Sequence, residues 1–75
     1  LKFGLKERAI TTLEIFNILG ESVSKVVDES LDAGFYNYRL DLSGYASGMY
    51  FYKLTARNED GSQLYGEMKK MILLQ

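Results

Sequence analysis

Apolar and polar residues alternate along most of this chain with a period of two, which is the period of a β-strand. Five segments show the alternation, at residues 1–6, 11–16, 23–26, 36–41 and 49–56. We expect a strand in each, because a period of two places every second side chain on the same sheet face. A sixth strand is expected at residues 63–74, which start polar and end in the apolar run 71–74. Such a run is typical of a strand covered on both faces.

Residues with turn chemistry separate these segments. Residues 17–20 and 58–61 each begin with Asn and end with Gly, which predicts two hairpin turns. Residues 28–34 form a longer polar connection, which is long enough to cross from one sheet to another.

The segment 43–48 consists mainly of small residues and predicts a further turn. Ser43 or Ser47 can cap a single turn of helix there. We expect Gly44 and Gly48 to relieve backbone strain in this turn.

Short strands separated by frequent turns predict an all-β fold. β-branched and aromatic residues fill the periodic segments and glycines interrupt them, which disfavours helices. We expect one immunoglobulin-like antiparallel β-sandwich of about six to seven short strands, spanning residues 1–75 as a single domain. The expected inner faces comprise Phe3, Leu5, Leu13, Ile15, Val23, Tyr36, Tyr38, Leu40, Tyr50, Tyr52, Leu54 and part of the segment 68–74.

Composition limits the chemistry that this domain can perform. The chain of 75 residues contains neither cysteine nor histidine, which removes disulfides, thiolate metal sites and the commonest general base. Its net charge is −1 with both signs mixed, so no basic face for nucleic acid is indicated. We therefore expect no catalytic residue, metal, cofactor, nucleic acid or small-molecule substrate. The size predicts a stability of about 3–5 kcal/mol.

Two ligand-binding interpretations are weaker than their structural counterparts. The Tyr36/Tyr38 and Tyr50/Tyr52 pairs could form a platform for sugars, but strand periodicity favours packing in the core. Acidic residues in two segments could bind calcium, but neither segment has the ligand count or spacing of a known calcium loop. These acidic residues are Asp28, Glu29 and Asp32 in one segment and Glu59 and Asp60 in the other.

Four segments, in order, resemble the motifs of one family. Residues 13–20, LEIFNILG, have the form apolar-x-apolar-aromatic, Asn, two apolar residues and Gly. Residues 31–34, LDAG, and the block at 41–56, DLSGYASGMYFYKLTA, follow. The segment 69–75, KKMILLQ, is basic and then apolar. Together they resemble the type A C-terminal sorting domain of the type IX secretion system, which is related to the immunoglobulin-like domain of the flagellar hook-capping protein.

This resemblance implies a function in transport. The domain would be a signal that the outer-membrane type IX translocon recognises, with a route through the periplasm to a secreted or outer-membrane surface location. A sortase-like cysteine peptidase could then remove the domain and attach the cargo to the surface. The chain starts with neither an initiator Met nor a signal peptide, and we expect it to be the C-terminal fragment of a longer secreted protein.

The family's C-terminal end is the part implicated in export, which identifies candidate recognition residues. An exposed final strand would offer unpaired backbone groups to a partner strand, and the same edge predicts weak self-association. Without the resemblance, Lys69 and Lys70 are more simply a solvated flank that prevents aggregation. The candidates are Gly44, Gly48, Lys69, Lys70, Met71, Ile72, Leu73, Leu74 and Gln75.

Two interpretations from another class stay open. The domain could be a structural spacer or assembly module, like the hook-capping domain, because that fold is shared between functions. It could also be an accessory domain of a carbohydrate-active enzyme.

Overall fold

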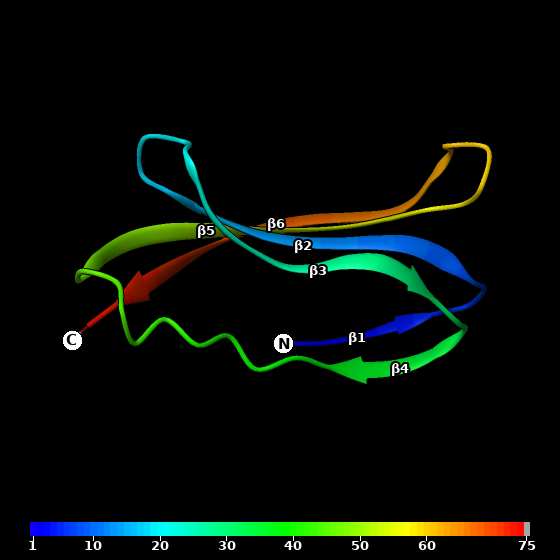
Figure 1. The fold of residues 1–75 in the computed structure, drawn as a ribbon, viewed down its shortest axis with the longest axis horizontal. Coiled ribbons are helices and arrows are strands. Elements are labelled where there is room, and N and C mark those ends of the chain that lie inside the picture. The colour runs from blue at the N-terminus through cyan, green and yellow to red at the C-terminus, as the bar shows by residue number, and fades with distance from the viewer. Residues whose placement is uncertain (75) are drawn as a thin grey trace.

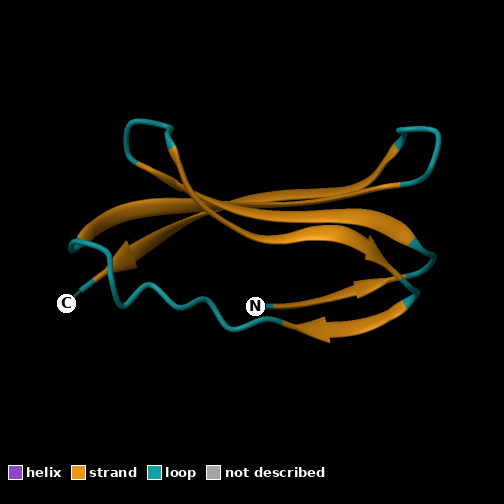
Figure 2. Ribbon diagram, viewed as in Figure 1, coloured by secondary structure: helices purple, strands orange, loops and turns teal. Residues whose placement is uncertain are grey.

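The computed structural model describes residues 1–74, which form six strands in two antiparallel sheets (Figures 1 and 2). The larger sheet has the order β3-β2-β5-β6, and the smaller sheet pairs β1 with β4. The described residues contain no helix, and the expected all-β, immunoglobulin-like sandwich is confirmed. The strands are β1 (Lys2–Leu5), β2 (Ala9–Asn17), β3 (Ser22–Leu31), β4 (Gly34–Asn37), β5 (Gly48–Arg57) and β6 (Gln63–Leu73).

Both predicted hairpin turns are confirmed. In the turn between β2 and β3, the side-chain oxygen Oδ1 of Asn17 accepts the backbone N–H groups of Leu19 and Glu21, each at 3.0 Å. Gly20 follows with φ of 82°, a conformation that glycine adopts without steric cost. In the turn between β5 and β6, Oδ1 of Asn58 accepts the N–H of Ser62 at 3.0 Å in the same way.

The core lies between the inner face of the larger sheet and the smaller sheet. Its fully buried centre is formed by Leu13, Ile15 and Leu54 from β2 and β5. Every residue named for the inner faces is in this core or packs against it, and from the segment 68–74 these are Met71 and Leu73. Sequence reasoning did not identify two further core residues of β3, Val27 and Leu31.

The tyrosines expected in the core are found there. Tyr50 and Tyr52 are buried in the larger sheet. The rings of Tyr36 and Tyr38 stack with Phe3, with centroid separations of 5.5 and 5.9 Å, and pack against the core. Core packing therefore accounts for these rings.

Strand β3 is longer than its sequence pattern predicts. It continues through polar residues as far as Leu31, so most of the expected connection at 28–34 is strand and only Asp32 and Ala33 join β3 to β4. The registers Asp28 with Thr12 and Glu29 with Thr11 show the cause, since backbone pairing with β2 continues there. β3 is an edge strand, where polar side chains are tolerated because they can face solvent.

The expected strand at 36–41 ends early. β4 stops at Asn37, and the ladder with β1 ends where the N–H of Tyr38 donates to the carbonyl of Leu1 at 2.8 Å. Residues 38–47 continue below the larger sheet without regular pairing (Figure 1). Leu40, Leu42 and Tyr45 still pack against the core, because alternation determines which side chains are buried and not whether the backbone is paired.

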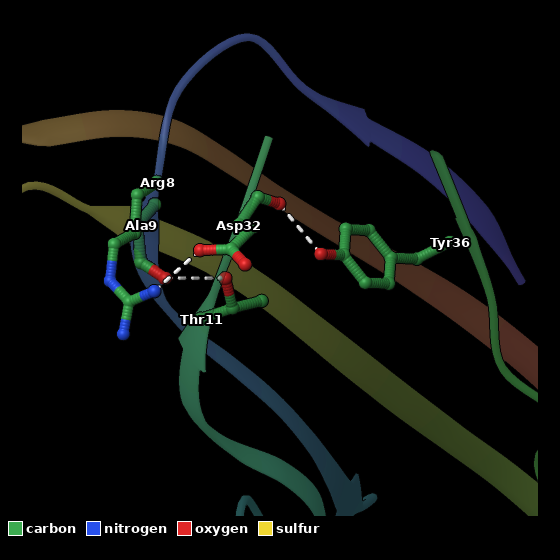
Figure 3. Close-up of polar contacts among 5 residues, drawn as sticks. All are labelled: Arg8, Ala9, Thr11, Asp32 and Tyr36. Carbon is green, nitrogen blue, oxygen red and sulfur yellow. Dashed lines mark hydrogen bonds and ion pairs between the residues drawn. The ribbon is translucent and has the colours of Figure 1, made fainter. Parts of the chain in front are cut away.

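An ion pair joins the two corners at one end of the sandwich (Figure 3). The guanidinium of Arg8, between β1 and β2, donates to the carboxylate of Asp32, between β3 and β4. The backbone carbonyl of Asp32 accepts the hydroxyl of Tyr36 at 2.6 Å.

Asp28, one of the acidic residues considered for calcium, lies 3.7 Å from the ammonium of Lys25. Among residues 1–74, no group of three or more His, Cys, Asp and Glu side chains could hold a metal ion.

Candidate recognition surface

The outer edge of β6 is one of the two edges of the larger sheet. This strand of 11 residues is the last strand of the larger sheet and pairs with β5. Its other edge therefore presents backbone N–H and C=O groups that can accept a further strand. The expected exposed final strand is confirmed.

The apolar end of β6 is covered on one face only. Met71 and Leu73 point inward and pack against the core. Ile72 and Leu74 are 67% and 85% exposed. The expectation that residues 71–74 are covered on both faces is therefore wrong. The physical reason is that the second layer covers only the inner face of the larger sheet.

The two candidate lysines lie on opposite faces of β6. Lys69 stands opposite Tyr52, a core residue, and so lies on the inner side of the strand. Its Nζ atom is 3.0 Å from the Oε1 atom of Glu67. Lys70 stands opposite Phe51 and lies on the outer face. The lysines therefore do not form one basic patch, although both are exposed to solvent at the edge.

Glu67 is the centre of a small polar cluster beside this edge. Its carboxylate accepts the hydroxyl of Tyr65, pairs with Lys69, and accepts the hydroxyl of Tyr52 at 3.3 Å. The hydrogen bond from Tyr65, followed by the one from Lys69, lowers the pKa of Glu67. The hydrogen bond to Glu67 raises the pKa of Lys69. Sequence reasoning missed this cluster, although the spacing Tyr65-x-Glu67-x-Lys69 already places the three side chains on one strand face.

The structure brings Gly48, but not Gly44, to the end of β6. Gly48 is the first residue of β5 and stands opposite Leu73. Its φ of 152° favours glycine, as expected for a strained position. Gly44 lies in the turn closed by the 3.0 Å bond from the N–H of Tyr45 to the carbonyl of Leu42. Gly44 is not among the glycines with positive φ, so the expectation that it relieves strain is wrong.

The outer face of the larger sheet carries an apolar hollow next to β6. The hollow has a volume of about 370 Å³, and Phe16, Ile18, Phe51 and Met68 form its apolar lining. Met68 is 59% exposed and Ile18 is 70% exposed. The sequence pattern did not predict this hollow, because it does not tell which face of a sheet is left uncovered. The last candidate, Gln75, lies outside the described residues.

These features define a class of protein before any comparison. The fold is an immunoglobulin-like sandwich, and the larger sheet ends in an open edge strand that carries exposed apolar and basic side chains. Such a surface is suited to binding another polypeptide by strand addition. In residues 1–74, no helix is long and apolar enough to cross a membrane.

A comparison with protein families identifies the particular family. The model of the family described as secretion system C-terminal sorting domain matches residues 1–72, and the chain belongs to this family. It is therefore a C-terminal sorting signal for type IX secretion, and the type IX machinery recognises it for export across the outer membrane to a secreted or surface location. Sorting domains of this family are not catalytic. Neither a curated protein nor a solved structure matches the chain.

Proposed function

We propose that the type IX translocon recognises this domain through the open edge and C-terminal end of β6. The proposed recognition residues are those from Lys69 to Gln75, together with Gly48, which begins β5, and Gly44 in the turn before it. The observation that supports this proposal best is the position of β6 at the edge of the larger sheet, with one edge unpaired. Gly48, opposite Leu73, supports the inclusion of the loop, because it adjoins the end of β6.

The mechanism that we propose is β-strand addition. A strand of the partner pairs with the backbone of β6, and the hydrogen bonds of the new ladder supply affinity. Exposed side chains along β6 supply selectivity, with Lys70 and Ile72 on the outer face and Lys69 on the inner face. The domain acts by binding alone, with no catalytic step, metal or cofactor of its own.

We also propose a route for the cargo before and after recognition. The cargo reaches the translocon from the periplasm, and a sortase-like cysteine peptidase then removes the domain and attaches the cargo to the cell surface. In support of recognition before removal, the C-terminal end is accessible, since Leu74 is 85% exposed.

A double charge reversal tests the recognition residues. Lys69→Glu with Lys70→Glu should abolish export of a fluorescent cargo carrying this domain, while the domain stays folded, since exposed substitutions usually change stability by less than about 0.5 kcal/mol. The matched control is Lys2→Glu with Lys6→Glu, which makes the same charge change at two exposed lysines near β1. The control should be exported normally.

The measurement is the fraction of fluorescence outside the cell, with far-UV circular dichroism of the purified variants to confirm folding. Normal export of the folded Lys69/Lys70 variant would show that these lysines are only a solvated flank. Equal loss in both variants would indicate a general charge effect rather than recognition of this end. Failure of the unaltered domain as well would favour a structural module.

A further inference from the structure

The sequence of β6 is close to self-complementary about its central residue, Met68. Glu67 and Lys69 flank Met68 and lie on the same face of the strand, where their side chains are 3.0 Å apart. If a second copy of β6 is laid antiparallel along the open edge, with a two-fold axis through Met68, each Glu67 stands opposite Lys69 of the other copy. We propose that the domain pairs with a second copy of itself in this register, which joins the two larger sheets into one.

Backbone geometry allows only some registers. In an antiparallel ladder, every second residue directs its N–H and C=O groups to a given edge. One set of β6 residues already pairs with β5, so the open edge presents the other set at every second position. Two copies of this edge can match only when the axis passes through a residue and not between two residues. The regular part of β6 available for this pairing is 65–73, because the register with β5 shifts beyond Tyr65.

Charge then selects among the allowed registers. An axis through Glu67, Lys69 or Lys70 places that residue opposite its own copy, and like charges directly opposite destabilise a pair of strands. An axis through Met68 instead forms two Glu67–Lys69 pairs between the copies. Axes nearer either end of β6 shorten the paired segment. The register through Met68 is therefore the longest one that avoids like charges.

The remaining pairs in this register are compatible with it. On the inner face, Tyr65 stands opposite Met71 of the second copy. On the outer face, Lys70 stands opposite Gly66 of the second copy, and the two Met68 side chains meet at the axis. Met68 is 59% exposed and Tyr65 is 43% exposed, so both have apolar surface to bury on pairing. Self-pairing uses the edge named in the proposed function, so the paired form has no open β6 edge, but it can be measured without any secretion component.

Cysteine cross-linking tests the register directly. The chain has no cysteine of its own. In Met68→Cys the two sulfurs meet at the axis, where opposite Cα atoms are about 4.5–5.5 Å apart, within the range for a disulfide. In the matched control, Ile72→Cys, the cysteine stands opposite residue 64 of the second copy, so the two cysteines are about 27 Å apart along the strand. Both positions are exposed on the same face.

Under mild oxidation, Met68→Cys should form a covalent dimer and Ile72→Cys should not. Equal cross-linking of the two variants, or none in Met68→Cys, would overturn the proposed register.

Charge exchange tests the same register without a covalent bond. Lys69→Glu alone places two carboxylates opposite each other in each cross-strand pair, and Glu67→Lys alone places two ammonium groups there. Each variant should self-associate at least about tenfold more weakly than the unaltered chain, since a tenfold change needs only about 1.4 kcal/mol spread over two pairs.

The mixed dimer differs from the dimers of the single variants. In the mixed dimer, the Lys69→Glu copy keeps its Glu67 and the Glu67→Lys copy keeps its Lys69, and these two unaltered residues form one cross-strand pair. The two introduced side chains form the other pair, and they are again of opposite charge. Both pairs are thus of opposite charge, and an equimolar mixture of the two variants should form a heterodimer.

Sedimentation velocity over a concentration series measures these associations, and far-UV circular dichroism confirms that each variant is folded. A monomeric unaltered chain throughout the series would overturn the proposal. The proposal would also be overturned if the single variants associated as tightly as the unaltered chain, or if the mixture associated no better than its components.

Discussion

Replacing Tyr52 with Ala should bring the domain close to unfolding. The ring is 8% exposed and lies in the core, opposite Ile15 of β2 and beside the polar cluster of Glu67. Deleting a buried aromatic side chain costs about 3–5 kcal/mol. A domain of this size has about 3–5 kcal/mol of stability in total. The cost is therefore comparable with the whole free energy of unfolding.

Urea denaturation followed by far-UV circular dichroism measures this effect, with Tyr52→Phe as the control. Phe keeps the ring and removes only the hydroxyl that donates to Glu67, which should cost about 0.5–1.5 kcal/mol. With a slope of about 1 kcal/mol per molar urea, the midpoint should fall by about 3 M or more for Ala and by about 1 M for Phe. Equal midpoints for the two variants would refute the reasoning, because the ring would then contribute nothing through burial.

Two further predictions concern the loop and the polar cluster. Gly48→Ala should destabilise the domain by about 1–3 kcal/mol, because the φ of 152° at this position strains any residue with a Cβ atom. Gly44→Ala should be nearly neutral, and equal effects of the two substitutions on the urea midpoint would contradict this. The lowered pKa of Glu67 means that its contribution to stability is present above its ordinary pKa of 4.5 and is lost as the pH falls through the folded-state value. Glu67→Gln should therefore weaken the loss of stability in acid, and an unchanged acid limb in a pH series of urea melts would contradict this assignment.

Alternation predicted the strands whose two faces differ most. β2 and β5 alternate between the core and the outer face, and the core residues Leu13, Ile15 and Leu54 follow directly from their period of two. The hairpin turns could also be predicted from the sequence, because their determinants are local. The side chain of Asn17 accepts a backbone N–H group of its own turn, and Gly20 adopts a positive φ.

Features that depend on a neighbouring strand could not be predicted in the same way. The polar residues Asp28 and Glu29 belong to β3 because β2 pairs with them. Their polar side chains do not by themselves indicate a strand. Residues 38–41 keep the alternation of a strand after the ladder with β1 has ended.

The candidate recognition residues could be selected from the sequence, but their surroundings could not. The apolar end of β6 and its neighbouring lysines could be selected from the sequence. Whether a hydrophobic residue such as Ile72 is covered depends on the number of layers, and in residues 1–74 no second layer covers the outer face of the larger sheet. The separation of Lys69 and Lys70 onto opposite faces follows from the period of two, but the pairing of Lys69 with Glu67 needed the structure.

Export of a fused cargo tests the central claim most directly. The domain is joined to a periplasm-targeted fluorescent protein in a bacterium that has type IX secretion, and fluorescence is measured outside the cell. The same fusion in a strain lacking the translocon controls for leakage. The sorting function predicts fluorescence in the medium or on the cell surface that depends on the translocon. Retention of a folded fusion in the periplasm of both strains would contradict it.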